Sequence, residues 1–309
     1  MAQQGGRIYR IGFLGVRSRS TPSNPDTYYD AFLQGMRDLG YVEGKNLVIE
    51  WRFADGKTER LPGLAAELVK SNSEVLVTHS TPGAQVLHRA TRTIPIVFMA
   101  VGNPIEIGLA KSLSRPGGNV TGQANMTNDV SSKQIQLLKE LNPALSRVAV
   151  LINPENATNS VILENVQTAG QQLGIRIQPL RIRVPEEIAQ AFDQATRERA
   201  EAIIVAADTL FIRQKKEIVQ WAAKNRLASI FPFSEDTDAG GLMSFGPIQS
   251  DVYRRGALFV DKILKGAKPS ELPIEQPTLF ELVINVKTAN ALRIKIPPNL
   301  LVRADRLIK

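Results

Sequence analysis

The sequence has 309 residues, 22% of them charged and 43% hydrophobic, with 38 Lys and Arg against 30 Asp and Glu and a formal net charge of +8. This length exceeds the usual size of one hydrophobic core and favours two lobes, and no apolar run approaches the roughly 20 residues that span a bilayer. The absence of cysteine excludes disulfides, thiolate catalysis and cysteine zinc sites, and the scattered basic residues argue against a nucleic-acid partner.

Apolar strand-like runs alternate with amphipathic helical segments through the first half of the chain. Strands are predicted at residues 8–16, 46–54, 73–80 and 94–101, and helices at 28–40, 61–71 and 83–92. Continuous apolar strands separated by amphipathic helices indicate parallel sheets that are covered on both faces. The predicted class is therefore α/β and doubly wound.

The second half repeats the same order of elements. Strands are predicted at residues 146–153, 175–182, 201–208 and 227–233, and helices at 160–174, 186–200 and 210–225. Leu39-Gly40 and Leu173-Gly174 each mark a helix end where glycine takes the left-handed cap, and a strand follows at once. Two doubly wound parallel-sheet lobes joined by a hinge are the result.

A further helix at residues 250–266 is one too many for the second lobe, so the chain is expected to return to the first lobe and then to leave it again. We expect residues 7–121 and 247–276 in lobe I, and residues 122–246 and 277–309 in lobe II. The runs at 118–125 and 242–247 are then crossing strands, with Gly117 and Gly118 as a turn that requires positive φ.

Ligands of open α/β sheets bind at the carboxyl ends of the strands, so the loops of two such lobes are expected to share one ligand cleft. Those loops are rich in Ser, Thr, Asn, Asp and Gly, which suits polar recognition, although turns and helix caps account for many of them. The candidate ligand-binding residues from these loops are Ser18, Ser80, Thr81, Asn103, Asn153, Asp208, Ser234 and Glu235.

Two of these positions suggest specific chemistry. The run "HSTPGAQVL" predicts a helix start with Ser80 or Thr81 as N-cap and Pro82 as its first helical residue, where a ligand carboxylate would meet backbone N–H groups and the helix dipole. Asp208 follows the apolar run "AIIVAAD", where it would pair with a ligand ammonium or simply cap the next helix. Asn103 and Asn153 occupy matching Asn-Pro turns.

An aromatic ligand would need a stacking wall, for which the candidates are Phe13, Tyr28, Tyr29, Phe211 and Phe233. His79 and His88 are expected to have surface or packing roles, since they are nine residues apart across a strand-to-helix turn. No catalytic residue, metal site or cofactor is predicted, because phosphate-loop and nucleophile-elbow motifs are missing.

Several longer runs resemble one family over residues 7–309. These are "AFLQGMRDLGYVEGKNLVIEWRFADG", "TIPIVFMAVGNPIEIGLAKSLSRPGGNVTG", "VAVLINP" and "INVKTANALRIKIPPNLLVRAD". They are similar to the extracytoplasmic solute-binding proteins of ABC importers, of the type I periplasmic-binding fold, in the subgroup associated with tryptophan and tyrosine. Arg293 stands where the family commonly has glycine, which puts the local helix cap in doubt.

The resemblance implies a non-enzymatic periplasmic protein that closes around a small solute, best an amino acid or related aromatic acid, and passes it to a membrane permease. It also implies a monomer whose signal peptide is absent from this sequence. Two alternatives share the architecture: the effector-binding domain of a transcription regulator, which would need a DNA-reading module, and a two-domain α/β enzyme, which would turn its ligand over.

Overall fold

The computed structural model describes residues 7–22, 25–125 and 127–309. By its internal contacts the chain divides into two compact units, residues 7–125 with 249–277 and residues 127–248 with 278–309. The boundaries expected from the sequence, after residues 121, 246 and 276, lie four, two and one residues before the points at which the chain passes between units. Within the described ranges, no helix has both the length and the apolar character needed to cross a membrane.

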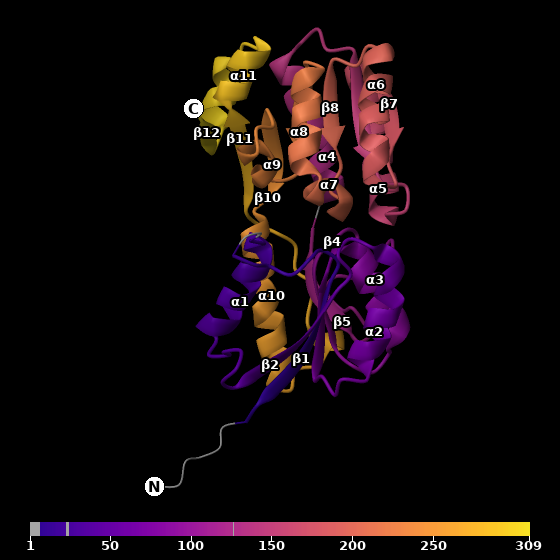
Figure 1. The fold of residues 1–309 in the computed structure, drawn as a ribbon, viewed down its shortest axis with the longest axis vertical. Coiled ribbons are helices and arrows are strands. Elements are labelled where there is room, and N and C mark those ends of the chain that lie inside the picture. Colours follow the sequence, from indigo (N-terminus) through magenta and orange to yellow (C-terminus); the bar gives the residue numbers. More distant parts are fainter. Residues whose placement is uncertain (1–6, 23–24, 126) are drawn as a thin grey trace. The chain divides into compact units, whose positions relative to one another are not determined.

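The first unit is a five-stranded parallel sheet with helices on both faces (Figure 1). Its strands lie in the order β2-β1-β3-β4-β5; they are β1 (Tyr9–Gly15), β2 (Leu47–Phe53), β3 (Val75–His79), β4 (Ile96–Val101) and β5 (Val120–Ala124). Its helices are α1 (Thr27–Asp38), α2 (Leu61–Val69), α3 (Ser80–Ala90) and α10 (Gln249–Leu264), with short 3-10 turns at Thr58–Arg60 and Pro269–Glu271.

Alternation along β1 explains why the sheet of the first unit is covered twice. Ile11 and Phe13 are buried in a cluster with side chains of α1 and α10, whereas Leu14 is buried with side chains of α2 and α3. Successive residues of a strand point to opposite faces, so an uninterrupted apolar strand needs a helix layer on each side. Each helix layer forms its own hydrophobic core against the sheet, which agrees with the predicted sheet covered on both faces.

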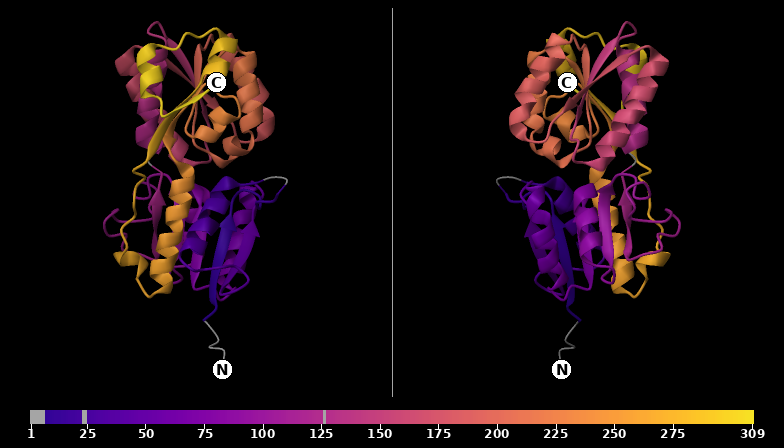
Figure 2. Two further views of the ribbon diagram at one scale, coloured as in Figure 1. Left: turned by 90° about the vertical axis from the view of Figure 1, so that its left-hand side faces the viewer. Right: turned by 90° about the vertical axis from the view of Figure 1, so that its right-hand side faces the viewer.

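The second unit has a seven-stranded sheet in the order β12-β11-β10-β9-β8-β6-β7, and Figure 2 shows it between two layers of helices. Its strands are β6 (Arg147–Ile152), β7 (Arg176–Arg181), β8 (Ala202–Val205), β9 (Ala228–Phe231), β10 (Met243–Pro247), β11 (Phe280–Asn285) and β12 (Arg306–Ile308). Its helices are α4 (Thr127–Leu141), α5 (Ala157–Leu173), α6 (Ile188–Arg197), α7 (Thr209–Arg213), α8 (Lys215–Lys224), α9 (Ser234–Asp238), α11 (Val286–Leu292) and α12 (Pro298–Arg303), with a 3-10 turn at Pro185–Glu187.

The internal repeat is visible in the two strand orders. The order β2-β1-β3-β4-β5 of the first unit matches β7-β6-β8-β9-β10 of the second, so β3 corresponds to β8 and β1 to β6. The predicted class, with two doubly wound lobes, is therefore confirmed. The sheet of the second unit departs from the predicted parallel arrangement at one place, since β11 runs antiparallel to β10. Pro247 pairs with Phe280, so the returning chain enters the sheet beside the point where it left, and it must run the other way.

The runs predicted to be crossing strands do not cross. β5 pairs with β4 inside the first unit, and β10 pairs with β9 inside the second, so the chain passes between units after each strand has ended. Of the two glycines predicted to form a turn with positive φ, Gly117 has a φ of +78°, whereas Gly118 does not have a positive φ. Gly122 has a different role in β5, because a Cβ there would lie 2.0 Å from the carbonyl oxygen of Phe98 on β4.

The two glycines predicted at helix carboxyl ends take the left-handed conformation, and a residue other than glycine takes it at a third helix end. Gly174 takes the left-handed conformation as the C-cap of α5, with a φ of +67°, and Gly40 after α1 has a φ of +89°. Arg293 takes the same left-handed position at the end of α11, with a φ of +59°. The cap geometry is thus retained without glycine, at the steric cost that any Cβ has in this region.

Candidate functional site

The candidate residues of the first unit lie at the carboxyl ends of neighbouring strands. Ser18 follows β1, Ser80 and Thr81 follow β3, and Asn103 follows β4. Because β1, β3 and β4 are adjacent and parallel in the sheet, the structure brings these four residues to one edge.

The start of α3 differs from the predicted cap. The helix begins at Ser80 with His79 as its N-cap residue, so Pro82 is the third helical residue and the predicted cap at Ser80 or Thr81 is wrong. The hydroxyl of Thr81 accepts a hydrogen bond from the Gly102 backbone N–H at 3.3 Å, which links the ends of β3 and β4. The His79 side chain makes no capping hydrogen bond to the first turn of α3.

Ser80 is strained and has an unused hydroxyl. Its φ of +64° lies in the left-handed region, which is costly for a residue with a Cβ. Its Oγ is buried without a hydrogen-bond partner in the described structure. A buried hydroxyl without a partner loses free energy relative to water, so a ligand acceptor at this place would recover it.

A buried arginine, which the sequence analysis did not single out, organises the end of β1. Arg17 forms a two-point ion pair with Asp26, the N-cap residue of α1, through Nε–Oδ2 at 2.7 Å and Nη2–Oδ1 at 3.1 Å. The guanidinium carbon lies 4.9 Å from the ring centre of Tyr29 and 5.7 Å from that of Tyr253 on α10. This arrangement fixes the loop that carries Ser18 against both α1 and α10.

His79 belongs to the same buried network. Its Nε2 accepts a hydrogen bond from the backbone N–H of Val16 at 3.0 Å, and the Tyr29 hydroxyl lies 2.8 Å from the same nitrogen. Burial first, and then the charge of Arg17, hold the pKa of His79 well below its usual value. The imidazole is therefore neutral, and its role is to join the ends of β1 and β3.

Asn103 forms a turn at the end of β4, where its Oδ1 accepts hydrogen bonds from the backbone N–H groups of Ile105 and Glu106 at 3.2 and 3.4 Å. Asn153 has the same local chemistry and accepts from the N–H of Glu155 at 3.0 Å. The two are nevertheless not equivalent in the repeat, since Asn153 follows β6, the counterpart of β1, and not of β4. An Asn-Pro turn is a local signal that carries no information about strand order.

Asp208 lies at the centre of the polar cluster of the second unit, at the carboxyl end of β8, which matches the position of Thr81 after β3. It caps α7, and its Oδ1 accepts from the Leu210 backbone N–H at 2.8 Å and from Asn153 Nδ2 at 3.3 Å. Its Oδ2 accepts from Asn156 Nδ2 at 2.8 Å. The helix cap, which is the alternative role for this residue, is thus present.

The Asp208 carboxylate has only neutral partners. It is 5% exposed, and it forms no ion pair with any Lys, Arg or His of the described residues. Burial raises its pKa, against the opposing hydrogen bonds from Asn156, Leu210 and Asn153. A buried carboxylate whose charge is uncompensated favours a cation at a free lone pair. Among the described residues only Asn156 donates to Oδ2, so this oxygen can accept a second donor.

Ser234 and Glu235 begin α9, which follows β9, so they lie at the same edge of the second sheet as Asp208. Both are half-buried. The next residue, Asp236, is buried, and burial raises its pKa to about 8 despite the nearby charge of Lys215. Asp236 lies in the first turn of α9, whose N-cap residue is Phe233.

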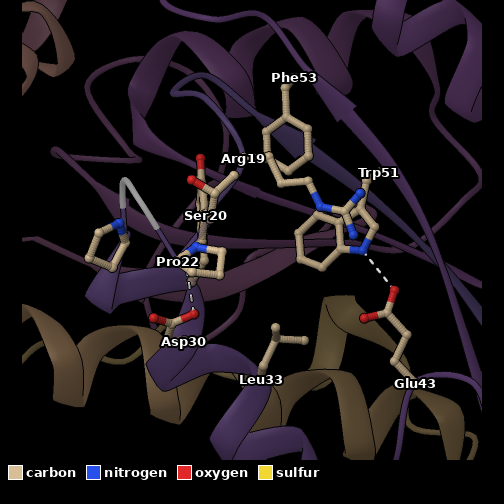
Figure 3. Close-up of a pocket in the computed structure, with 11 residues that line it drawn as sticks. Arg19, Ser20, Pro22, Asp30, Leu33, Glu43, Trp51 and Phe53 are labelled. Carbon is tan, nitrogen blue, oxygen red and sulfur yellow. Dashed lines mark hydrogen bonds between the residues drawn. The ribbon is translucent and has the colours of Figure 1, made fainter.

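The aromatic residues proposed as a stacking wall are all core side chains, with exposures of 6% or less for Phe13, Tyr28, Tyr29, Phe211 and Phe233. The first unit instead has a hollow of about 360 Å³ along β2 and α1 (Figure 3). Trp51 and Phe53 line it as a stacked pair with ring centres 5.5 Å apart, and Trp51 donates to Glu43 Oε1 at 2.8 Å.

This hollow lies on the flank of the first unit. Its lining includes Leu33 on α1 and Glu43 before β2, whereas Ser18, Ser80, Thr81 and Asn103 are not part of it. It nevertheless adjoins them, because its lining also includes Arg19 and Ser20, which directly follow Ser18, and Phe53, the last residue of β2. Tyr29 lines the hollow, and its hydroxyl lies 2.8 Å from His79 Nε2.

Sequence reasoning missed Arg17, Asp26 and Asn156 as parts of the strand-end clusters. In the sequence Asn156 matches only a glycosylation-type pattern. Its place shortly after an Asn-Pro turn and just before a helix could nevertheless have indicated that it caps α5. Arg17 offers no such signal, because its environment includes Tyr253, which is distant in the sequence.

Comparison with known proteins shows which protein family the chain resembles. The family model for ABC transporter substrate binding proteins matches residues 20–308. A tyrosine-binding protein of Clostridioides difficile is 26% identical over 282 residues, which are 90% of this chain and 80% of that protein.

Two solved structures are similar in both sequence and fold. A conserved domain protein of Vibrio cholerae has a TM-score of 0.91 at 27% identity, and a Streptococcus pneumonia ABC domain in complex with L-Trp has a TM-score of 0.90 at 26% identity. Each comparison covers 97% of this chain and 100% of the other. From the family match and the two-unit fold, this chain belongs to the ABC transporter substrate binding proteins.

Proposed function

We propose that this protein captures an aromatic amino acid, tyrosine or tryptophan being the first candidates, and delivers it to an ABC permease. Two similar proteins point to this class of ligand, one named for tyrosine and one solved with L-Trp. The observation that carries the proposal is the Asp208 carboxylate, buried with neutral hydrogen-bond donors and no cationic partner among the described residues.

The ligand ammonium pairs with Asp208 Oδ2, because this oxygen has one donor and can accept another. The ligand carboxylate lies at the start of α3, where Ser80 offers a buried hydroxyl without a partner and the helix offers its N-terminal dipole. Asn153 Nδ2 already donates to Asp208 Oδ1, so the main role of Asn153 is to position the Asp208 carboxylate. Ser18, Asn103, Ser234 and Glu235 complete the polar surroundings.

On this account each unit binds one charge of the zwitterion, so ligand binding favours a closed arrangement of the two units over an open one. The protein acts outside the cytoplasm as a monomer, without catalysis and without a nucleic-acid partner. Small-angle scattering with and without ligand tests the closure: compaction on binding is expected, and an unchanged radius of gyration with ligand bound contradicts it.

Calorimetry with a matched ligand series tests the proposed ligand. L-tyrosine and L-tryptophan are compared with tyramine and tryptamine, which lack the carboxylate, and with indole-3-propionate, which lacks the ammonium. We expect saturable binding of at least one of the two amino acids and a loss of about 2–5 kcal/mol, roughly 30-fold or more in affinity, for each truncated analogue. Indole-3-propionate binding as tightly as L-tryptophan would exclude the ammonium pairing.

The same titration separates a binding protein from an enzyme. The ligand is recovered from the protein and identified by mass spectrometry after prolonged incubation. A binding protein returns it unchanged, whereas a new product that accumulates with time would show that the chain is an enzyme.

A further inference from the structure

Four arginines gather at the amino ends of two neighbouring strands in the second unit. Arg147 begins β6 and Arg176 begins the edge strand β7, and the two residues pair directly in the sheet. Arg197 ends α6, and Arg199 follows two residues later. Together with Gln178 and Glu198, these arginines line a hollow of about 260 Å³.

The side chains converge because of strand register. Arg147, Ala149 and Leu151 point to the face of the sheet that α6 covers, and Arg176, Gln178 and Leu180 on β7 are their pairing partners. Farther along, Ala149 and Leu180 are buried with side chains of α6. At the amino end the helix stops at Arg197, which leaves the hollow open beside the three long polar side chains.

Gln178 supplies an independent sign that this hollow takes a ligand. It is only 7% exposed, and its Nε2 is buried without any acceptor in the described structure. Its pairing neighbour in β6 is Ala149, which has no polar side-chain atom to offer. A buried amide donor without an acceptor is destabilising, and an anion in the hollow would supply that acceptor.

The positive charge here exceeds what the protein itself neutralises. None of the four arginines forms an ion pair with a carboxylate of the described residues. Arg147 Nη1 donates to the Glu198 backbone carbonyl at 3.3 Å, while the Glu198 carboxylate accepts from Gln194 at 3.0 Å. The other nearby carboxylate, Glu201, accepts from the Ser146 hydroxyl at 2.6 Å and from the Arg147 backbone N–H at 3.1 Å, and its charge also attracts Arg147. Two carboxylates therefore offset only part of the charge of four guanidinium groups. A favourable interaction with the carboxyl end of α6 explains Arg197 alone.

We propose that this hollow, which we call the arginine hollow (Arg147, Arg176, Gln178, Arg197, Glu198 and Arg199), binds a phosphate-type oxyanion. Guanidinium groups present paired N–H donors that match the oxygens of such an anion, and Gln178 Nε2 adds a neutral donor at the floor. The anion is either free phosphate or the phosphate of a lipid headgroup, which share this chemistry.

The arginine hollow is remote from the amino-acid site. Arg147 begins β6, and Asn153 follows its last residue, so about 20 Å of extended strand separates them. The sites therefore lie at opposite ends of one sheet, and this proposal does not depend on which amino acid the protein binds.

In the test, inorganic phosphate is titrated into the whole protein, and calorimetry measures the binding. The ionic strength is held constant with chloride as the competing salt. Arg147→Gln combined with Arg176→Gln removes two charges, and Gln178→Leu removes the amide donor. Arg183→Gln is the matched control, because Arg183 is exposed and lies past the other end of β7. Circular dichroism and thermal unfolding check that each variant is folded.

We expect saturable phosphate binding that weakens at least tenfold in the double arginine variant, weakens several-fold in Gln178→Leu and stays within twofold in Arg183→Gln. Sedimentation with phosphatidylcholine vesicles, with and without phosphatidylglycerol, distinguishes free phosphate from a lipid headgroup. A lipid headgroup is identified if the protein binds the anionic vesicles, phosphate displaces it from them, and the double variant does not bind. Saturable phosphate binding without vesicle binding identifies free phosphate. Phosphate effects no larger than those of chloride, or equal in wild type and double variant, would overturn the proposal.

Discussion

Replacing Asp208 by asparagine separates the two roles of this side chain, helix cap and ligand partner. Asparagine has the same shape without the charge, so the Leu210 N–H can still find an acceptor at Oδ1. The amide nitrogen of the substituted side chain would then face Asn156 Nδ2, which is also a donor. Asn156 cannot turn over to resolve this, because its Oδ1 accepts from the Thr158 N–H as the cap of α5.

The stability cost of this variant should be small. One lost hydrogen bond with a donor left unpaired lowers the free energy of unfolding by about 1–3 kcal/mol. Removing a buried charge that has no cationic partner offsets much of that loss, since burial disfavours the carboxylate and raises its pKa. We therefore expect a net loss of about 1 kcal/mol or less in the ligand-free protein.

The cost to binding should be large. Without Asp208 the ligand ammonium is desolvated without a counter-charge, which weakens affinity by about 2–5 kcal/mol, or roughly 30-fold to a few thousandfold. In the wild type, affinity should also rise with pH through the raised pKa of Asp208, because only the ionised carboxylate pairs with the ammonium. Asp208→Asn should abolish that dependence.

Urea unfolding of the ligand-free proteins measures the first quantity, and calorimetry with L-tyrosine and L-tryptophan measures the second. Asp193→Asn serves as control, since Asp193 is an exposed carboxylate on α6 in the same unit. A variant that loses several kcal/mol of stability yet binds ligand as tightly as wild type would show that Asp208 is a helix cap only.

Three further predictions concern stability. Arg17→Met leaves Asp26 without its ion-pair partner and removes the cation beside Tyr29 and Tyr253. The free energy of unfolding should fall by about 3 kcal/mol and the midpoint of thermal unfolding should fall with it, whereas an unchanged midpoint would contradict the network. Gly122→Ala places a Cβ against the Phe98 carbonyl oxygen at a φ of +143°, and denaturant titration should show a loss of about 2 kcal/mol or more. Gly63→Ala is the control and should cause no loss, because space is open there and alanine favours the helix α2. For Asp236, whose pKa is raised to about 8, the native state binds a proton more readily than the unfolded chain, so its contribution to stability is present at low pH and lost as pH rises from about 4 to 8. Asp236→Asn should therefore gain stability over wild type between pH 5 and 7.5, and a constant difference across this range would contradict the raised pKa.

The fold could be predicted from sequence because its signals are local. Apolar strands, amphipathic helices and glycine caps such as Gly174 each act within a few residues, and their repetition gives two lobes. The direction of β11 could not be predicted this way, since an antiparallel strand has the same apolar pattern as a parallel one. The left-handed cap at Arg293 was doubtful for a related reason, because packing of the whole helix overrides the preference of one residue.

The candidate site divides along the same line. Asp208 ends an apolar run, and Asn153 lies in a short Asn-Pro turn, so both positions are visible in the sequence. The structure joins the two residues by a hydrogen bond. The Arg17 network depends on Tyr253, more than two hundred residues away, and no local pattern encodes that contact. The start of α3 differs from the predicted one because Ser80 takes a left-handed φ, which a residue with a Cβ disfavours and a local pattern does not indicate.

A crystal structure of the protein grown with L-tyrosine or L-tryptophan tests the central claim most directly, because it locates both charges of the ligand. We expect the ammonium nitrogen within hydrogen-bond distance of Asp208 Oδ2 and the carboxylate at the start of α3, with the Ser80 hydroxyl as one of its donors. An amino acid bound with its ammonium away from Asp208, or no amino acid bound at saturating concentration, would contradict it.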